Sequence, residues 1–295
     1  MIRRSKGEQV FGVFNAVVLI LVAFLCAYPM YYVICASFSD PGELMRHGGF
    51  LFKPLGFNLG GYKIVLQNME VYTGYFNTII YVIGGALLSV VLTLMGGYVL
   101  SRKDLLWKNA IMFIFVFTMY FGGGLIPTYL IVEKLGLVDS RWSMIILGAC
   151  STYNMIIMRT TIYGIPDSIE EAAEIDGAGP MRILVSIITP LCKPTMAVIA
   201  LFCIFGKWND WFNPMIYLRD RSKYPLQTFL REILIVNNMQ NATGEQAVRD
   251  TANLNLNRYV IQYCTIIVST VPVLAAYPFL QKYFASGMMV GAVKG

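Results

Sequence analysis

The chain has 295 residues, of which 57% are hydrophobic and 14% are charged. Soluble domains carry about 25% charged residues, and the mean hydropathy here is +0.60. These values exclude an ordinary soluble protein and predict an all-α, multi-pass membrane protein. The net charge of +6 is interpreted as membrane topology, not as nucleic-acid binding. The sequence has one histidine, and its cysteines lack metal-ligand spacing, so it predicts no His-based metal site or triad. It has no glycine-rich Lys-Ser/Thr loop, so it predicts no bound ATP on this chain.

The first apolar stretch follows Arg3, Arg4 and Lys6, as in a secretory signal. However, its uncharged run lasts from Gln9 to Ser39, far beyond the short apolar core of a signal. We therefore expect a retained transmembrane helix within Val10–Phe38.

Six stretches are candidates for spanning helices, each of which needs about 20 apolar residues. Lys and Arg gather before the first stretch, between the second and third, around the segment before the fifth, and after the last. All four groups fall on one side if both termini are cytoplasmic. We thus expect an N-terminal helix and outer loop (1–71), a core of five spans (72–281) and a cytoplasmic tail (282–295). The candidate spans are Val10–Phe38, Tyr72–Leu100, Ala110–Val132, Trp142–Met158, Pro194–Tyr217 and Tyr259–Gln281.

The third span contains Gly122–Gly124, shortly before Pro127. A glycine run followed by proline favours a kink or break in a membrane helix. The bend either lines a transport pathway or serves helix packing, and the sequence leaves both readings open.

A short charged island, Ser168–Arg182, interrupts the apolar spans. Ser168 and Glu171 form a capping-box pattern, which predicts a helix start with acids in its first turn. Gly177 is suited to the left-handed conformation that ends a helix, and Pro180 to the first position of a new one. The island therefore predicts a helix-Gly-helix elbow (165–190), too short and polar to cross a bilayer. Its acidic residues are Glu170, Glu171, Glu174 and Asp176.

The elbow resembles the EAA signature of permease subunits in bacterial ABC importers. The resemblance rests on Glu171-Ala172-Ala173, Asp176-Gly177-Ala178, Ile187 and Pro190, and it departs at Thr189, where the family usually has leucine. It implies a type I ABC-importer permease fold, in which the elbow is a coupling helix that docks into a cytoplasmic ATPase. The alternative is an amphipathic cytoplasmic loop without that role.

The same resemblance implies roles for individual elbow residues. Glu171 and Glu174 would meet basic groups on the ATPase, Ala172 and Ala173 would allow close packing, and Gly177 would supply the bend. The ATPase-coupling residues are therefore expected to be Glu170, Glu171, Ala172, Ala173, Glu174, Asp176, Gly177 and Ala178.

The fifth span contains polar residues deep in an apolar run. Lys207 and Asp210 are three residues apart, which places them on one face of a helix. Lys207 would lie roughly 20 Å along a helix that begins at Pro194, and ionisable groups at such depth often mark transport pathways. The alternative is a structural ion pair with an interfacial aromatic belt. The candidate pathway residues are Lys207, Trp208, Asn209, Asp210, Trp211 and Asn213.

This segment, Gly206–Pro214, is also similar to the Trp-Asn-Asp/Glu motif of carbohydrate importers, and Tyr277–Phe284 with Gly287–Gly295 resembles the C-terminus of that subgroup. The resemblance implies import of sugars, with complex and often uronic oligosaccharides as the finer expectation. It also implies that Lys294 and its neighbours reach between the ATPases.

The outer loop Leu218–Arg258 is polar, and its segment Tyr224–Arg231 is amphipathic, so we expect that segment on the outer surface. The loop is either an ordinary cap or part of a dock for a substrate-binding protein.

Together these features predict a transport subunit, not an enzyme, in a bacterial cytoplasmic membrane. The resemblance implies a second permease, two copies of an ABC ATPase that carry the ATP and Mg²⁺, an extracytoplasmic sugar-binding protein and membrane lipid as partners, with no cofactor on this chain. The alternative from another class is an ion-coupled secondary transporter of small polar solutes that uses Lys207 and Asp210 as a relay. An intramembrane enzyme lacks the His-Asp or paired-Asp arrangement it would need.

Overall fold

The computed structural model describes residues 6–233 and 260–275, and within these ranges all regular secondary structure is helical. The described residues form two compact units. The first holds 6–69, 232–233 and 260–272, and the second holds 70–231 and 273–275. The tail 282–295, Lys294 and most of the loop Leu218–Arg258 lie outside the described residues.

The first unit is built on α1 (Lys6–Ser37), whose apolar side chains are exposed along most of the helix. A helix that is apolar on all sides suits lipid or a partner chain rather than water. Two short helices follow, α2 (Pro41–Arg46) and α3 (Gly60–Gln67). Asp40 caps α2 by accepting from the backbone N–H groups of Gly42 and Glu43. Residues 260–275 form an apolar helix held to the end of α1 by the thiol of Cys264, which donates to the carbonyl oxygen of Ser37.

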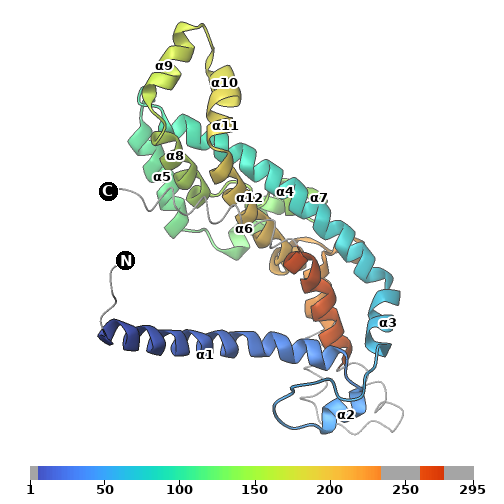
Figure 1. Cartoon of the computed structure of the whole chain (residues 1–295). Helices are drawn as coiled ribbons and strands as arrows, with labels where there is room; N and C mark the ends of the chain where they lie inside the picture. Colours follow the sequence, from blue (N-terminus) through green and yellow to red (C-terminus); the bar gives the residue numbers. More distant parts are fainter. Residues whose placement is uncertain (1–5, 234–259, 276–295) are drawn as a thin grey trace. The chain divides into compact units, whose positions relative to one another are not determined.

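The second unit is organised along α4 (Met69–Ser101), an unbroken helix of 33 residues. Figure 1 shows α8 (Thr152–Tyr163) and α12 (Lys193–Trp208) beside it, with the elbow projecting beyond one end. Glycines allow the close approach of α4 to α8. A Cβ atom at Gly97 would lie 2.6 Å from Cγ of Met158, a contact that real side chains do not make.

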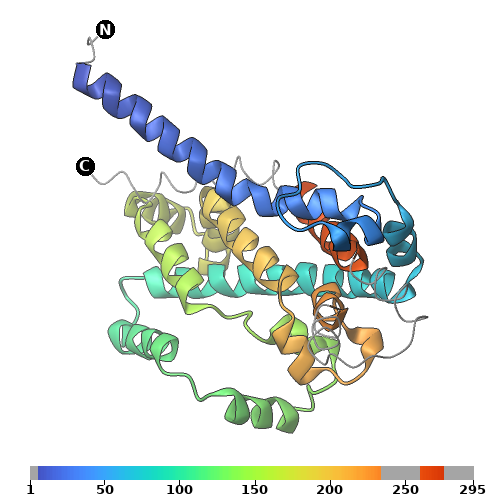
Figure 2. The same ribbon diagram turned by 90° about the horizontal axis from the view of Figure 1, so that it is seen from below.

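Three of the predicted spans are interrupted. The third divides into α5 (Lys108–Tyr120) and α6 (Leu125–Lys134), bent by 114°, so the predicted break at Gly122–Gly124 is confirmed. These two helices lie at an edge of the unit, in the green colours of Figure 2.

The fourth and fifth spans were predicted as continuous helices, and this was wrong. The fourth divides into α7 (Arg141–Ile146) and α8, with Gly148 between them at φ +75°. The fifth ends at Trp208, where α12 gives way to α13 (Phe212–Tyr217). Glycine at a left-handed position and the Asn-Asp pair after Trp208 favour a change of direction over a continuing helix.

Two described helices, Val10–Ser37 and Met69–Ser101, are each long and apolar enough to cross a membrane. Two bent pairs also qualify when each is taken as one span: α5 with α6, and residues 180–191 with α12. The count of six spans and the cytoplasmic position of both termini stay predictions.

A polar cluster fixes the loops at the end of α4 that lies away from the elbow. The Asp139 carboxylate accepts from Nζ of Lys223 at 2.9 Å and from the backbone N–H groups of Arg219 and Asp220. These donors, Lys223 first, lower the pKa of Asp139 to about 2. A short 3₁₀ turn, η2 (Arg221–Lys223), is thereby held in place.

The predicted amphipathic segment Tyr224–Arg231 becomes helical from residue 226. Its apolar face is buried, with Leu226 fully enclosed and Phe229 and Leu230 nearly so. The backbone N–H of Leu226 donates to the hydroxyl of Thr78 on α4 at 2.9 Å. The segment is therefore a packed part of the second unit, joined to α4.

Candidate functional site

The elbow consists of two helical arms and a tight bend. The first arm, α9 (Asp167–Ile175), starts directly after Pro166. The bend contains Gly177 at φ +78°, as predicted from its freedom to adopt the left-handed region. The second arm begins with α10 (Pro180–Ile183), with Pro180 at its first position, also as predicted. It continues through a π-helical turn, η1 (Leu184–Ile188), and α11 (Thr189–Leu191).

The predicted capping box at Ser168 was wrong. The N-cap residue is Pro166, which makes no side-chain cap hydrogen bond, so Ser168 lies inside the first turn of α9. Asp167 and Glu170 are the acids of that turn, where a negative charge interacts favourably with the helix dipole.

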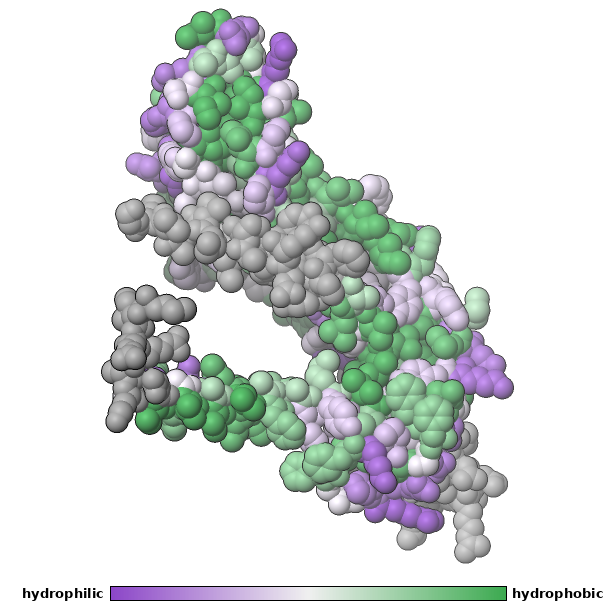
Figure 3. Space-filling model, viewed as in Figure 1, coloured by the Kyte–Doolittle hydropathy of each residue, from purple (hydrophilic) through white to green (hydrophobic). Residues whose placement is uncertain are grey.

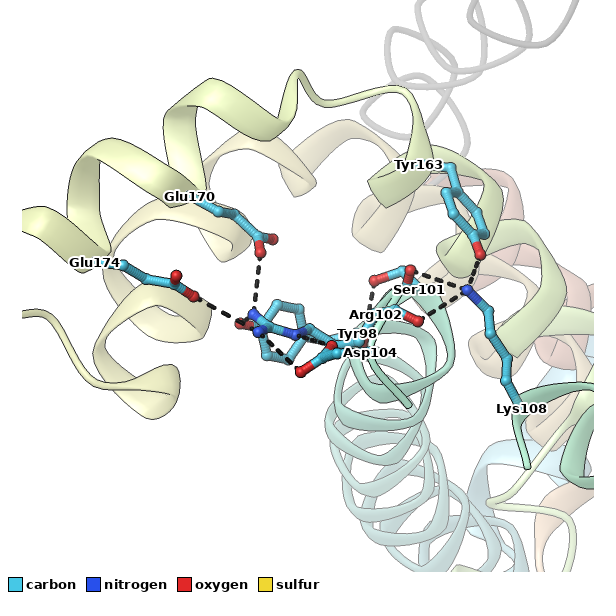
Figure 4. Close-up of polar contacts among 8 residues, drawn as sticks. All are labelled: Tyr98, Ser101, Arg102, Asp104, Lys108, Tyr163, Glu170 and Glu174. Atoms are coloured by element: carbon cyan, nitrogen blue, oxygen red, sulfur yellow. Dashed lines mark hydrogen bonds and ion pairs between the residues drawn. The ribbon is translucent and has the colours of Figure 1, made fainter. Parts of the chain in front are cut away.

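The acidic residues of the elbow differ in their contacts. Glu170 and Glu174 lie one turn apart and face Arg102, which directly follows α4 (Figure 4). The guanidinium is 3.2 Å from Glu170 and 3.5 Å from Glu174. Glu171 and Asp176 are exposed, and so is about half of the Glu174 side chain. Glu174, expected to meet a partner, therefore pairs within its own chain. Glu171 forms no ion pair within the described residues.

Arg102 is oriented by further groups at the end of α4. Asp104 contacts its Nε at 3.1 Å, and the hydroxyl of Tyr98 accepts from it at 3.3 Å. These contacts, Asp104 first, raise the pKa of Arg102. Lys108 completes the cluster by donating to the carbonyl oxygens of Ser101 and Arg102 and by contacting the hydroxyl of Tyr163. A cleft of about 540 Å³ lies between this cluster and α9.

The three alanines of the signature differ in burial. Ala173 is buried in the core of the unit with Tyr98, Met158 and Ile183, and Ala178 packs against the same core. Ala172 is exposed. Ala173 therefore packs the elbow onto its own chain.

The outer surface of the elbow is apolar in its centre. Its large exposed side chains are Ile175 at 86%, Met181 at 63% and Val185 at 59% exposure. Figure 3 shows this end of the molecule as a hydrophobic area flanked by hydrophilic side chains. Exposed apolar groups with a polar rim are typical of an interaction surface.

A second site is a cavity of about 670 Å³ between α4, α8 and α12. Three of the predicted pathway residues line it: Lys207, Asp210 and Asn213. The other three lie elsewhere. Trp208 packs near the ring of Tyr75. Asn209, which follows α12, donates to the carbonyl of Phe205 in the last turn of that helix. Trp211 is covered by the guanidinium of Arg231.

Lys207 is held by backbone carbonyls and not by Asp210. Its Nζ donates to the carbonyl oxygens of Met144 and Leu147, at 2.6 Å each, where α7 ends. Within the described residues no ion pair joins Lys207 to Asp210. The predicted shared helical face does not form because α12 ends at Trp208, and Asp210 instead accepts from the backbone and side-chain nitrogens of Asn213. An ammonium has three N–H groups, so one remains for the cavity.

Several lining residues were not identified from the sequence. They share a small or polar side chain isolated in an apolar span, without a motif around it. A polar residue inside a predicted span was the one signal for them. They include Gly85, Ser89, Ser151, Tyr153, Asn154 and Cys203.

These features define a helical membrane protein with broken helices around a cavity that contains charged and polar side chains, and with an exposed elbow at one end. Residues 90–212, which contain the elbow and all of α12, match the family described as binding-protein-dependent transport system inner membrane component. The chain belongs to this family, and the resemblance inferred from the elbow is thus confirmed.

Several of its relatives are named as permease proteins of polysaccharide or oligosaccharide transport systems. The chain is 37% identical to the polygalacturonan/rhamnogalacturonan transport system permease protein YtcP of Bacillus subtilis, over 94% of this chain and 96% of that protein. It is 35% identical to protein LplC of the same organism, over 99% and 97%. Among solved structures, a chain of a bacterial ABC transporter involved in the import of the acidic polysaccharide alginate superposes with a TM-score of 0.86, at 33% identity over 96% of this chain and all of that one.

Proposed function

We propose that this chain is a membrane-spanning permease subunit of an ATP-driven importer of acidic oligosaccharides. The observation that carries the proposal is the exposed elbow, which bears the family signature and stands at the end of a helical unit with a cavity that contains Lys207. Both the relative YtcP and the alginate transporter are named for acidic polysaccharides. The family and these names support the substrate class.

The elbow is the contact to a cytoplasmic ATPase in this proposal. Glu171, Ala172 and the exposed side chains of Ile175, Met181 and Val185 would meet the ATPase surface. Glu170, Glu174, Ala173 and Ala178 would instead fix the elbow on its own chain. ATP and Mg²⁺ would be bound and used on two copies of that ATPase, and this chain would perform no catalysis.

The remaining partners follow from the family. Its description as binding-protein-dependent supports an extracytoplasmic sugar-binding protein. A second permease would complete the pathway, and the apolar faces of α1, α5 and α6 would meet lipid or that permease. The six-span topology, with both termini in the cytoplasm of a bacterium, completes the proposal.

The cavity is the proposed passage for sugar. Lys207 offers one remaining N–H and a positive charge, while Asp210, Asn213, Ser89 and Asn154 offer hydrogen-bonding groups at its wall. A partly desolvated cation attracts a carboxylate, so this lining favours a uronate over a neutral sugar. The cavity does not favour the ion-coupled carrier, since Lys207 and Asp210 form no paired relay.

Purification of the tagged chain from its native host, followed by mass spectrometry and reconstitution, tests the proposal. We expect an ATPase, a second permease and a binding protein to co-purify, and the reconstituted complex to take up a uronic oligosaccharide only with ATP. A chain that purifies alone, and whose uptake needs an ion gradient but no ATP, would refute it.

A further inference from the structure

Three helices of the second unit reach from the cavity to the elbow, and one of them is not joined to the elbow through the chain. α8 and the second arm with α12 are covalently continuous with the elbow. α4 contributes Gly85 and Ser89 to the cavity wall and runs unbroken to Ser101. At 1.5 Å per residue, the path from Gly85 to Arg102 is about 26 Å. α4 is therefore a rigid rod whose link to the elbow must come from side chains.

Arg102 provides that link. Its guanidinium lies between Asp104 on one side and Glu170 and Glu174 of α9 on the other (Figure 4). The side chains of Arg102 and Glu170 are only 27% and 23% exposed, so water screens this pair less than a surface pair. Two carboxylates one helical turn apart fix the direction of α9 as well as its distance, because the planar guanidinium can donate to several acceptors at once.

The other contacts between α4 and the first arm are weaker or lack direction. Lys103 pairs with Asp167, but these side chains are 71% and 64% exposed, and exposed pairs contribute little. Ala173 packs near Tyr98 in an apolar cluster, which allows sliding.

We propose that Arg102 is a positioning residue that makes α4 follow the elbow, so that movement of the elbow shifts the α4 wall of the cavity. The proposal rests on the proposed function, because it assigns a consequence to elbow movement. That wall directly abuts the cavity lysine: a Cβ atom at Gly85 would lie 2.9 Å from Cε of Lys207. A shift of α4 therefore acts on the lysine that faces the sugar.

The experiment uses the complete importer in lipid nanodiscs or proteoliposomes and measures sugar transported per ATP hydrolysed. We expect Arg102→Gln to lower this ratio by about fivefold or more, the low end of typical coupling between sites. The double variant Glu170→Gln/Glu174→Gln removes the partners instead of the arginine and should lower the ratio similarly. Arg102→Lys keeps the positive charge but lacks the planar guanidinium that donates to several acceptors at once, so its transport-to-hydrolysis ratio should lie between those of Arg102→Gln and the native protein.

Lys103→Gln is the matched control, since it removes the same charge one residue away, and its ratio should stay near that of the native protein. The proposal would be overturned if the double glutamine variant kept the native ratio of sugar transported to ATP hydrolysed. It would also be overturned if Lys103→Gln lowered that ratio as much as Arg102→Gln. If Arg102→Gln fails to assemble, the double variant decides. The native complex distinguishes failure of the proposed function from failure of the positioning role. If the native complex shows no ATP-driven sugar uptake, the proposed function is wrong. If the native complex transports sugar, and Arg102→Gln and the double variant keep the native ratio of sugar transported to ATP hydrolysed, only the positioning role is wrong.

Discussion

Replacement of Lys207 by glutamine tests whether the cavity selects acidic sugars. The change removes the positive charge but keeps a side-chain amide that can still donate to the carbonyls of Met144 and Leu147, the groups that hold Lys207. The variant therefore separates the charge from much of the structural contact. A loss confined to acidic substrates is the expected result.

The magnitude follows from the charge and the size of the site. A sugar carboxylate inside a cavity of about 670 Å³ comes within roughly 8 Å of Nζ. At an effective dielectric constant of about 20, two unit charges at that distance interact by about 2 kcal/mol, which corresponds to about 30-fold. Because solvent in the cavity reduces this value, we expect the ratio of uronate uptake to neutral-sugar uptake to fall by about tenfold.

The assay compares initial uptake rates of a uronic and a neutral oligosaccharide in proteoliposomes that contain the full importer. The ratio is informative because a general loss of stability lowers both rates together. Asn209→Ala serves as the matched control, since the Asn209 side chain donates to the carbonyl of Phe205 at the end of α12 and does not line the cavity. If both rates fall equally in Lys207→Gln, the lysine only holds the end of α7, and the argument for charge selection is refuted.

Three further changes test the packing, the bend and the polar cluster. Gly97→Ala places a Cβ 2.6 Å from Cγ of Met158, so α4 and α8 must separate by about 0.8 Å to reach ordinary contact, and we expect the protein to be destabilised by about 1–3 kcal/mol. Thermal unfolding measures this loss. Gly206→Ala is the control, because a Cβ there would have no atom within 4 Å and should cause no destabilisation. Gly177→Val forces a branched residue to φ +78° at about 1–2 kcal/mol and should reduce both sugar uptake and sugar-stimulated ATP hydrolysis; full retention of both would contradict the coupling role. Because the pKa of Asp139 is lowered to about 2, its stabilising contribution is complete above its ordinary value of 3.8 and is lost as the pH falls towards 2. The unfolding temperature of the native protein should therefore fall more steeply over that interval than that of Asp139→Asn, and parallel curves would show that the carboxylate contributes nothing.

Local rules were sufficient where one residue type determines the backbone. Gly177 adopts the left-handed conformation, Pro180 starts the second arm, and the Gly122–Gly124 run breaks the third span. Each outcome depends on the backbone preferences of glycine or proline, which a sequence displays directly. The breaks in the fourth and fifth spans depend on packing between distant segments as well, and an apolar composition does not reveal them.

The candidate site was predicted only in part for the same reason. The partners of Lys207 are carbonyl oxygens 60 and 63 positions earlier, and every residue has a carbonyl, so no side-chain pattern identifies them. Arg102 and Glu170 are 68 positions apart. The sequence placed Glu170 and Glu174 on the elbow, but which of its acids face inward depends on where α4 ends.

Thr189 links the departure from the family signature to a local structure. Its hydroxyl and its backbone N–H both donate to the carbonyl oxygen of Leu184, five positions earlier, where η1 is π-helical. Pro190 follows, and a proline cannot donate a backbone hydrogen bond and clashes with the carbonyl four residues earlier in an α-helix. A wider turn relieves this clash, and the threonine hydroxyl adds a second donor at the carbonyl where that turn begins. A leucine side chain has no such donor. Thr189, the residue that departs from the signature, therefore supports the second arm of the elbow just before the chain bends by 81° into α12.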